Sequence, residues 1–353
     1  MTMLRLSNSI AVNIALVVFL FCSCSPRERD AYLRSLKMEA VQIAPFDSLD
    51  LEEYDILAPY RIAKVGDWLV VPDAKGEYNI SMINPMTHKR LDFIRKGRGP
   101  GEMIHGMNIH RRDDKVIIAD QASSVCVAFD VIKSAERGAA VMDTVGRFGD
   151  SPSRPVTLVY TGKGFIASNM LDQDSWYSYY DERGNILSSV SRMGFPELGI
   201  DDVDFVTSIK LASLYTASPD GNRICVANVL SAAVSFAVLE GNELREVKRY
   251  EIIPPSIENR GNHYAFSRDA TSAFQSISST DEYVYLLYSG NKSFSKDGVP
   301  GFEGNHLVLY DWNGKVIRLY ALSRNISSIY IEDGIAFCSS WYPEPGIFMY
   351  KLE

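Results

Sequence analysis

Residues 66–73 read Gly66-Asp67-Trp68-Leu69-Val70-Val71-Pro72-Asp73, a short Gly/Asp turn followed by a run of strand-forming residues. The chain repeats this unit, and the later copies begin at Asp113, Gly162, Asp220, Asp281 and Glu332. Successive starts lie about 47 to 61 residues apart, a spacing that suits a four-stranded propeller blade with variable loops. The repetition therefore predicts an all-β fold, a six-bladed β-propeller.

A second strand-like run follows each of these units. Several of the runs close on a turn of the Asp-x-x-Gly kind, as in residues 181–184 and 311–314. Glycine supplies the positive φ that such a reversal needs. Because propeller blades pack on both faces, near-continuous apolar runs are expected in place of strict alternation. We therefore expect each blade to be a meander of antiparallel strands.

The two ends of the chain predict how the ring closes. The last blade ends with the strand-like run 347–352 and so lacks an outermost strand. The unassigned segment Leu36–Ile43 is predicted to supply it, so that an N-terminal strand closes the ring in the last blade. Pairing the two termini in one blade removes exposed strand edges.

The N-terminus has the features of an export signal. One positive charge, Arg5, precedes an apolar run at 10–21 that only Asn13 interrupts. About 12 apolar residues suit a signal peptide and are too few to span a bilayer. Cys24 follows a small residue, which resembles a bacterial lipobox. Residues 1–23 are therefore predicted to be a lipoprotein signal peptide, and Cys24 the lipid attachment site.

The domain organisation follows from this assignment. Residues 24–35 are predicted to be the lipidated N-terminus and linker, and residues 36–353 the propeller. Several acyl chains on Cys24 would hold the protein on a membrane. An ordinary cleaved signal that releases a soluble periplasmic protein is the alternative.

Composition and cysteine usage limit the function classes. The chain is 46% hydrophobic and 23% charged with a formal net charge of -8, which argues against nucleic acid as a partner. After the anchor, three cysteines remain inside apolar strand-like runs, and we predict that they are small buried side chains. They are Cys126, Cys225 and Cys338.

Residues 95–103, Arg-Lys-Gly-Arg-Gly-Pro-Gly-Glu-Met, join the first blade to the second. This stretch resembles the GxGPGEF-type motif of the TolB-like six-bladed propeller lipoproteins of Bacteroides and its relatives, the BF3164-like family. Met103 stands where that family usually has Phe. The resemblance implies a propeller at the cell envelope. Together with Cys24, it leads us to predict a lipid anchor at the outer membrane, on its periplasmic or surface face. It implies no activity.

The same motif has two physical interpretations. In the first, Gly99, Pro100 and Gly101 form a tight turn, and Glu102 accepts hydrogen bonds from backbone N–H groups. In the second, Arg98 and Glu102 project over the central channel and contact a ligand. No helix pattern or GK[ST] ending follows, so the stretch is not a phosphate-binding P-loop.

Basic residues recur where the chain approaches the predicted innermost strands. Arg154, Arg268 and Arg324 occupy this position in three blades, and Arg61 and Lys210 fall nearby in two others. If they converge, they form a basic ring at the channel mouth that suits a small anionic ligand or an acidic partner loop. Alternatively, the arginines join neighbouring blades through carboxylates.

The histidines do not form a metal-binding pattern. His105 and His110 are the one close pair, but their spacing of five suits no zinc site on a strand, and we predict that both are structural or exposed. No catalytic residue, metal site or cofactor is predicted. The sequence favours a monomeric, non-enzymatic binding or scaffolding lipoprotein whose partners are the membrane and an unknown envelope protein or small ligand. The alternative is a propeller hydrolase or lyase, of the sugar-lactonase or peptide-lyase kind, with a channel metal.

Overall fold

The computed structural model describes residues 31–120, 122–148, 155–169, 172–193, 209–251, 257–260, 264–267, 270–292 and 301–352. The chain divides into two units, Met1–Lys37 and Met38–Glu353. In the first unit, the described residues include the short helix α2 (Ala31–Ser35). The predicted signal peptide and the predicted lipid attachment site, Cys24, lie outside the described residues. Among those that are described, no helix combines the length and apolar character needed to cross a membrane.

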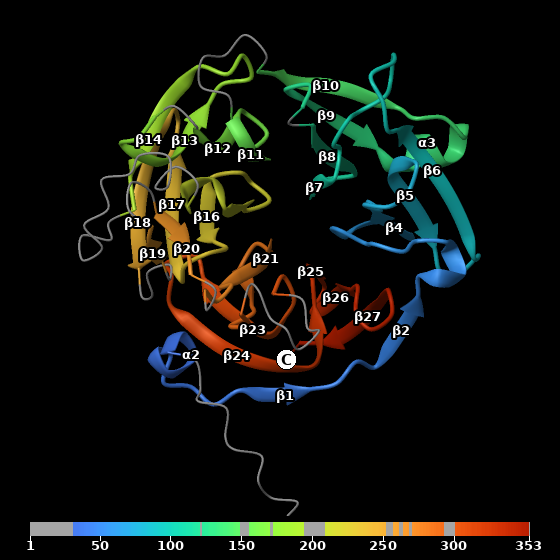
Figure 1. Ribbon diagram of the computed structural model, residues 1–353. Coiled ribbons are helices and arrows are strands. Elements are labelled where there is room, and N and C mark those ends of the chain that lie inside the picture. The colour runs from blue at the N-terminus through green and yellow to red at the C-terminus, as the bar shows by residue number, and fades with distance from the viewer. Residues whose placement is uncertain are drawn as a thin grey trace, which may run out of the picture. The chain divides into compact units, whose positions relative to one another are not determined.

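The second unit contains six sheets of four or five strands, arranged around a common centre as the repeat predicted (Figure 1). Each sheet is a blade, and its strands run in order from the centre of the ring outward. Blade 1 contains β3 (Ala63–Val65), β4 (Trp68–Val71), β5 (Tyr78–Asn84) and β6 (Lys89–Arg95). Blade 2 contains β7 (Asn108–Arg112), β8 (Lys115–Asp120), β9 (Val125–Asp130) and β10 (Met142–Arg147). Blade 3 contains β11 (Pro155–Tyr160), β12 (Phe165–Asn169), β13 (Ser175–Tyr180) and β14 (Ile186–Ser191).

The remaining blades follow the same order. Blade 4 contains β15 (Ser213–Ala217), β16 (Arg223–Asn228), β17 (Ala233–Glu240) and β18 (Glu243–Glu251). Blade 5 contains β21 (Phe274–Ser279), β22 (Tyr283–Tyr288), β23 (Gly304–Asp311) and β24 (Val316–Ile326). Blade 6 contains β25 (Ser328–Glu332), β26 (Ile335–Ser340) and β27 (Gly346–Lys351). The connections carry η1 (Glu52–Tyr54), α3 (Val131–Arg137) and the hairpin of β19 (Ile257–Asn259) and β20 (Tyr264–Phe266).

Two short N-terminal strands join two different blades. β2 (Asp47–Asp50) pairs antiparallel with β27 and is the fourth strand of blade 6. β1 (Val41–Ile43) pairs parallel with β24 and is a fifth strand of blade 5. The sequence predicted that residues 36–43 form the outer strand of the last blade. This position was wrong, because Val41–Ile43, the part that forms a strand, pairs with blade 5.

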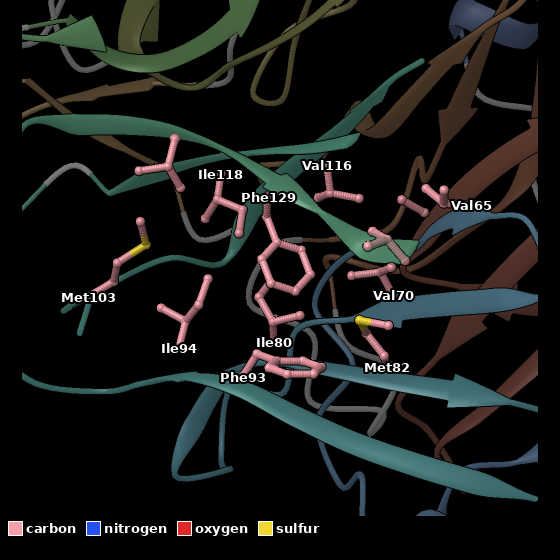
Figure 2. Close-up of a cluster of buried hydrophobic side chains, with 13 residues drawn as sticks. Val65, Val70, Ile80, Met82, Phe93, Ile94, Met103, Val116, Ile118 and Phe129 are labelled. Carbon is pink, nitrogen blue, oxygen red and sulfur yellow. The ribbon is translucent and has the colours of Figure 1, made fainter. Parts of the chain in front are cut away.

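The hydrophobic core lies between neighbouring blades. Figure 2 shows the cluster between blades 1 and 2, where Phe129 of β9 faces Ile80 and Phe93. The two phenylalanine rings lie 5.5 Å apart in a tilted arrangement. Comparable clusters join blades 2 and 3, 3 and 4, 5 and 6, and 6 and 1. The three cysteines are free and buried, which confirms their predicted role as packing residues.

Candidate functional site: the central cavity

The innermost strands enclose a cavity of about 450 Å³ on the axis of the ring. Residues of β7, β11, β15, β21 and β25 line it, together with Arg61 and Ile62, which precede β3. Each of these inner strands is the edge strand of its own sheet. Edge strands present unpaired backbone N–H and C=O groups, so the cavity wall must satisfy or expose them.

In one part of the cavity wall, serine hydroxyl groups accept hydrogen bonds from the backbone N–H groups of an inner strand. Ser276 Oγ accepts a hydrogen bond from the backbone N–H of Ile329, and Ser278 Oγ accepts one from that of Ile331, both at 3.1 Å. Thr216 and Ser279 exchange a 2.7 Å hydrogen bond between blades 4 and 5. We call these four hydroxyl residues the serine wall.

A second set of cavity-lining residues has ionisable side chains, and we call it the charged wall: Arg61, His110, Arg111, Arg112 and Glu332. Glu332 of blade 6 accepts from Lys64 of blade 1 at 2.5 Å and from Arg111 of blade 2. Arg111 also donates to Tyr330 Oη at 2.7 Å. Burial alone would raise the pKa of Glu332, but the hydrogen bonds from the two cations lower it. One carboxylate therefore joins three blades.

Two arginines of the charged wall have no carboxylate partner among the described residues. Arg61 donates to the backbone carbonyl of Gln275 at 3.2 Å and lies over the ring of Tyr60. Arg112 lies over the ring of Tyr160, with its guanidinium carbon 5.9 Å from the ring centre. Both side chains are half-buried and line the cavity. The cavity therefore contains two guanidinium groups that form no salt bridge with a described carboxylate.

His110 is the third polar group of this wall, and its contact with blade 3 agrees with the predicted structural role. Its Nε2 accepts a 3.1 Å hydrogen bond from the backbone N–H of Tyr160. Burial and the neighbouring Arg112 lower its pKa to about 4, so the ring is neutral at physiological pH. The sequence held a usable signal: Asn108, His110 and Arg112 alternate just before the Asp113-Asp114 turn of an inner strand.

The loop 96–103 has the structural role that its turn residues suggested. Glu102 Oε2 accepts from the backbone N–H of Gly99 at 2.8 Å, and a Cβ on Gly97 would overlap this carboxylate. Met103 is buried in the core between blades 1 and 2. Neither Arg98, which is exposed, nor Glu102 lines the cavity. The interpretation that both reach over the channel was therefore wrong.

The predicted basic ring does not form from the described residues. Lys210 is buried and its ammonium donates to the backbone carbonyl of Asp172, outside the cavity lining. Arg324 lies on the outer strand β24 and stacks on Phe348 at 4.3 Å, because β24 continues to Ile326 and the inner strand begins only at Ser328. Of the described candidates, Arg61 alone lines the cavity. Arg154 and Arg268 lie outside the described residues.

Metal-ligating side chains do not cluster in the described part of the chain. It contains no group of three or more His, Cys, Asp or Glu side chains placed to hold a metal ion. The acidic residues of the cavity lining other than Glu332 are Asp113, Asp281 and Asp333, which belong to exposed turns at the ends of inner strands.

Known proteins share the fold at low sequence identity. A presumed exported protein of Bacteroides fragilis matches with a TM-score of 0.50 and 12% identity, over 89% of this chain and 100% of its own. A DUF4221 family member from Bacteroides vulgatus matches with a TM-score of 0.53 and 8% identity, over 89% and 98%. No curated protein sequence matches the chain. The model of the TolB-like 6-blade propeller family matches residues 41–334, and the chain therefore belongs to that family.

Proposed function

We propose that this protein is a lipid-anchored, non-enzymatic binding protein of the bacterial cell envelope whose central cavity holds a small anionic ligand. The observation that carries the proposal is the pair Arg61 and Arg112, two half-buried cations in one cavity without a described carboxylate partner. Placing cationic groups in a confined cavity is costly unless an opposite charge compensates them. A bound anion would supply that charge.

The cavity suits this role in size and in chemistry. Its volume of about 450 Å³ lies within the range of small-molecule sites. Arginine presents a planar fork of donors that matches a carboxylate or phosphate in two parallel hydrogen bonds. Arg111 is excluded from this role because Glu332 and Tyr330 already occupy it.

The envelope location rests on the N-terminus and on the relatives. The lipobox-like Cys24, the resemblance of residues 95–103 to the BF3164-like lipoproteins and the exported relative from Bacteroides fragilis support an anchor at the outer membrane. Substituting Cys24→Ala should move the protein from the membrane fraction to the soluble fraction and abolish labelling by palmitate. A Cys24→Ala protein that is still labelled and membrane-bound would contradict the anchor.

The ligand proposal is tested with the purified full-length chain in detergent micelles. We expect 4-fluorobenzoate, followed by ¹⁹F NMR, to bind saturably and to lose at least about tenfold in affinity in the double variant Arg61→Gln/Arg112→Gln. Arg98→Gln is the matched control, because this arginine is exposed and outside the cavity. Equal affinity in the double variant and the wild type would overturn the proposal.

A further inference from the structure

One face of β7 carries a row of polar side chains that line the cavity. Asn108, His110 and Arg112 alternate along the strand, so all three point to the same side. Alternate residues of a strand lie about 7 Å apart. A small molecule in the cavity can therefore contact two neighbouring members of the row.

The hydrogen bond from the backbone of Tyr160 fixes the tautomer of His110. Because Nε2 accepts this N–H, the neutral ring carries its hydrogen on Nδ1. No described residue accepts from Nδ1. His110 therefore offers the cavity a neutral N–H donor.

The neighbouring Arg112 is held in place by blade 3. Its guanidinium lies over Tyr160 and against the Gly162 turn, where a Cβ would collide with it. Gly162 has a φ of +93°, a conformation that glycine adopts without strain. The fork of donors is therefore positioned before any ligand arrives, which lowers the entropic cost of binding.

We propose that His110 Nδ1–H and the Arg112 guanidinium form a subsite for the carboxylate of a small organic acid. This inference rests on the proposed function and names the ligand class. Both groups donate and neither accepts, so they select an acceptor-only oxyanion. Their joint charge of one matches a carboxylate. Asp113, next in the chain, adds a negative charge that disfavours a phosphate dianion.

The test uses the full-length chain in micelles with 4-fluorobenzoate as the probe. We expect Arg112→Gln alone to weaken binding at least about tenfold and Arg112→Lys to weaken it less, since lysine keeps the charge and loses the fork. Acetate should displace the probe more effectively than inorganic phosphate at equal concentration. In protein labelled with ¹⁵N-histidine, the Nδ1 signal of His110 should report the Nδ1–H tautomer and shift on saturation.

The outcomes separate this inference from the proposed function. If the double variant Arg61→Gln/Arg112→Gln loses binding while Arg112→Gln alone binds like the wild type, the subsite is wrong and the ligand-binding function stands. Stronger displacement by phosphate than by acetate overturns the carboxylate assignment. If the wild type binds none of these probes saturably, both proposals fall.

Discussion

The serine wall and the charged wall both join neighbouring blades around the cavity, but with different chemistry. On the serine wall, short neutral hydroxyls at Ser276 and Ser278 accept directly from the backbone of blade 6. On the charged wall, Glu332 joins its own blade to blades 1 and 2 through Lys64 and Arg111. On the serine wall, these backbone N–H groups therefore find their acceptors within the protein. On the charged side, Arg61 and Arg112 have no salt-bridge partner among the described residues, which is why a ligand site is expected there.

The difference also concerns how each wall responds to its surroundings. Hydroxyl groups do not titrate in the physiological range and are barely affected by salt. Ionised groups respond to pH, ionic strength and the loss of a single partner. Changes in pH or salt concentration should therefore alter the free energy of unfolding more through the charged wall than through the serine wall.

The largest effect is expected from Glu332→Ala. Removing this carboxylate leaves Lys64 and Arg111 without their shared partner, although both are largely screened from solvent. We expect a loss of about 3 kcal/mol in the free energy of unfolding, measured by urea denaturation. Glu240→Ala, which breaks an exposed pair with Arg245, should cost about 0.5 kcal/mol or less. Similar losses in the two variants would refute the bridging role of Glu332.

The next effect is a pH dependence that His110 confers. Its folded pKa of about 4 lies below the unfolded value of about 6.5, so between these values the unfolded chain binds more protons. Stability therefore falls as the pH falls through this window, by about 2 kcal/mol after allowance for partial exposure. His110→Gln should remove this part of the dependence. A constant stability difference between wild type and variant from pH 7 to pH 4 would contradict the buried neutral histidine.

A smaller effect is expected on the serine wall. The double substitution Ser276→Ala/Ser278→Ala removes the acceptors of two backbone N–H groups, which water in the cavity can partly replace. We expect a loss of about 1.5 kcal/mol that does not change between pH 7 and pH 4. Threonine at the same positions keeps the hydroxyl and should restore most of the loss. A pH-dependent loss would show that the walls are not independent.

The smallest effect is that of salt. Raising the salt concentration from about 0.1 to 1 M shortens the screening length from about 10 to 3 Å. The cost of Glu332→Ala should then shrink by a few tenths of a kcal/mol, whereas the cost of the serine substitutions should not change. Equal salt responses in the two walls would remove the distinction between them.

The blades could be predicted from the local sequence, but the strand pairing that closes the ring could not. Turn residues and apolar runs recur in each blade, so six sheets could be predicted. β2 (Asp47–Asp50) has two aspartates and no apolar run, and its assignment to blade 6 depends on pairing with β27, almost 300 residues away. Local pattern contains no information about such pairing, which is decided by tertiary contacts.

The candidate site was predictable to the same limited degree. Arg61 directly precedes an inner strand and lines the cavity, but its role in ligand binding stays a prediction. Arg324 was misplaced because β24 runs for 11 residues and carries it on the outer strand. His110 and Arg112 were missed as a pair because zinc spacing was the criterion applied to the histidines. Alternation along an inner strand next to a turn would have found them.

The central claim is that the His110–Arg112 subsite of the charged wall binds a small carboxylate, and a ¹⁹F NMR titration of 4-fluorobenzoate into the full-length protein tests it most directly. We predict saturable binding by the wild type, by Arg98→Gln and by Ser276→Ala/Ser278→Ala, and at least about tenfold weaker binding by Arg112→Gln. Binding that is unchanged in Arg112→Gln, or lost only when the serines are replaced, would contradict the claim.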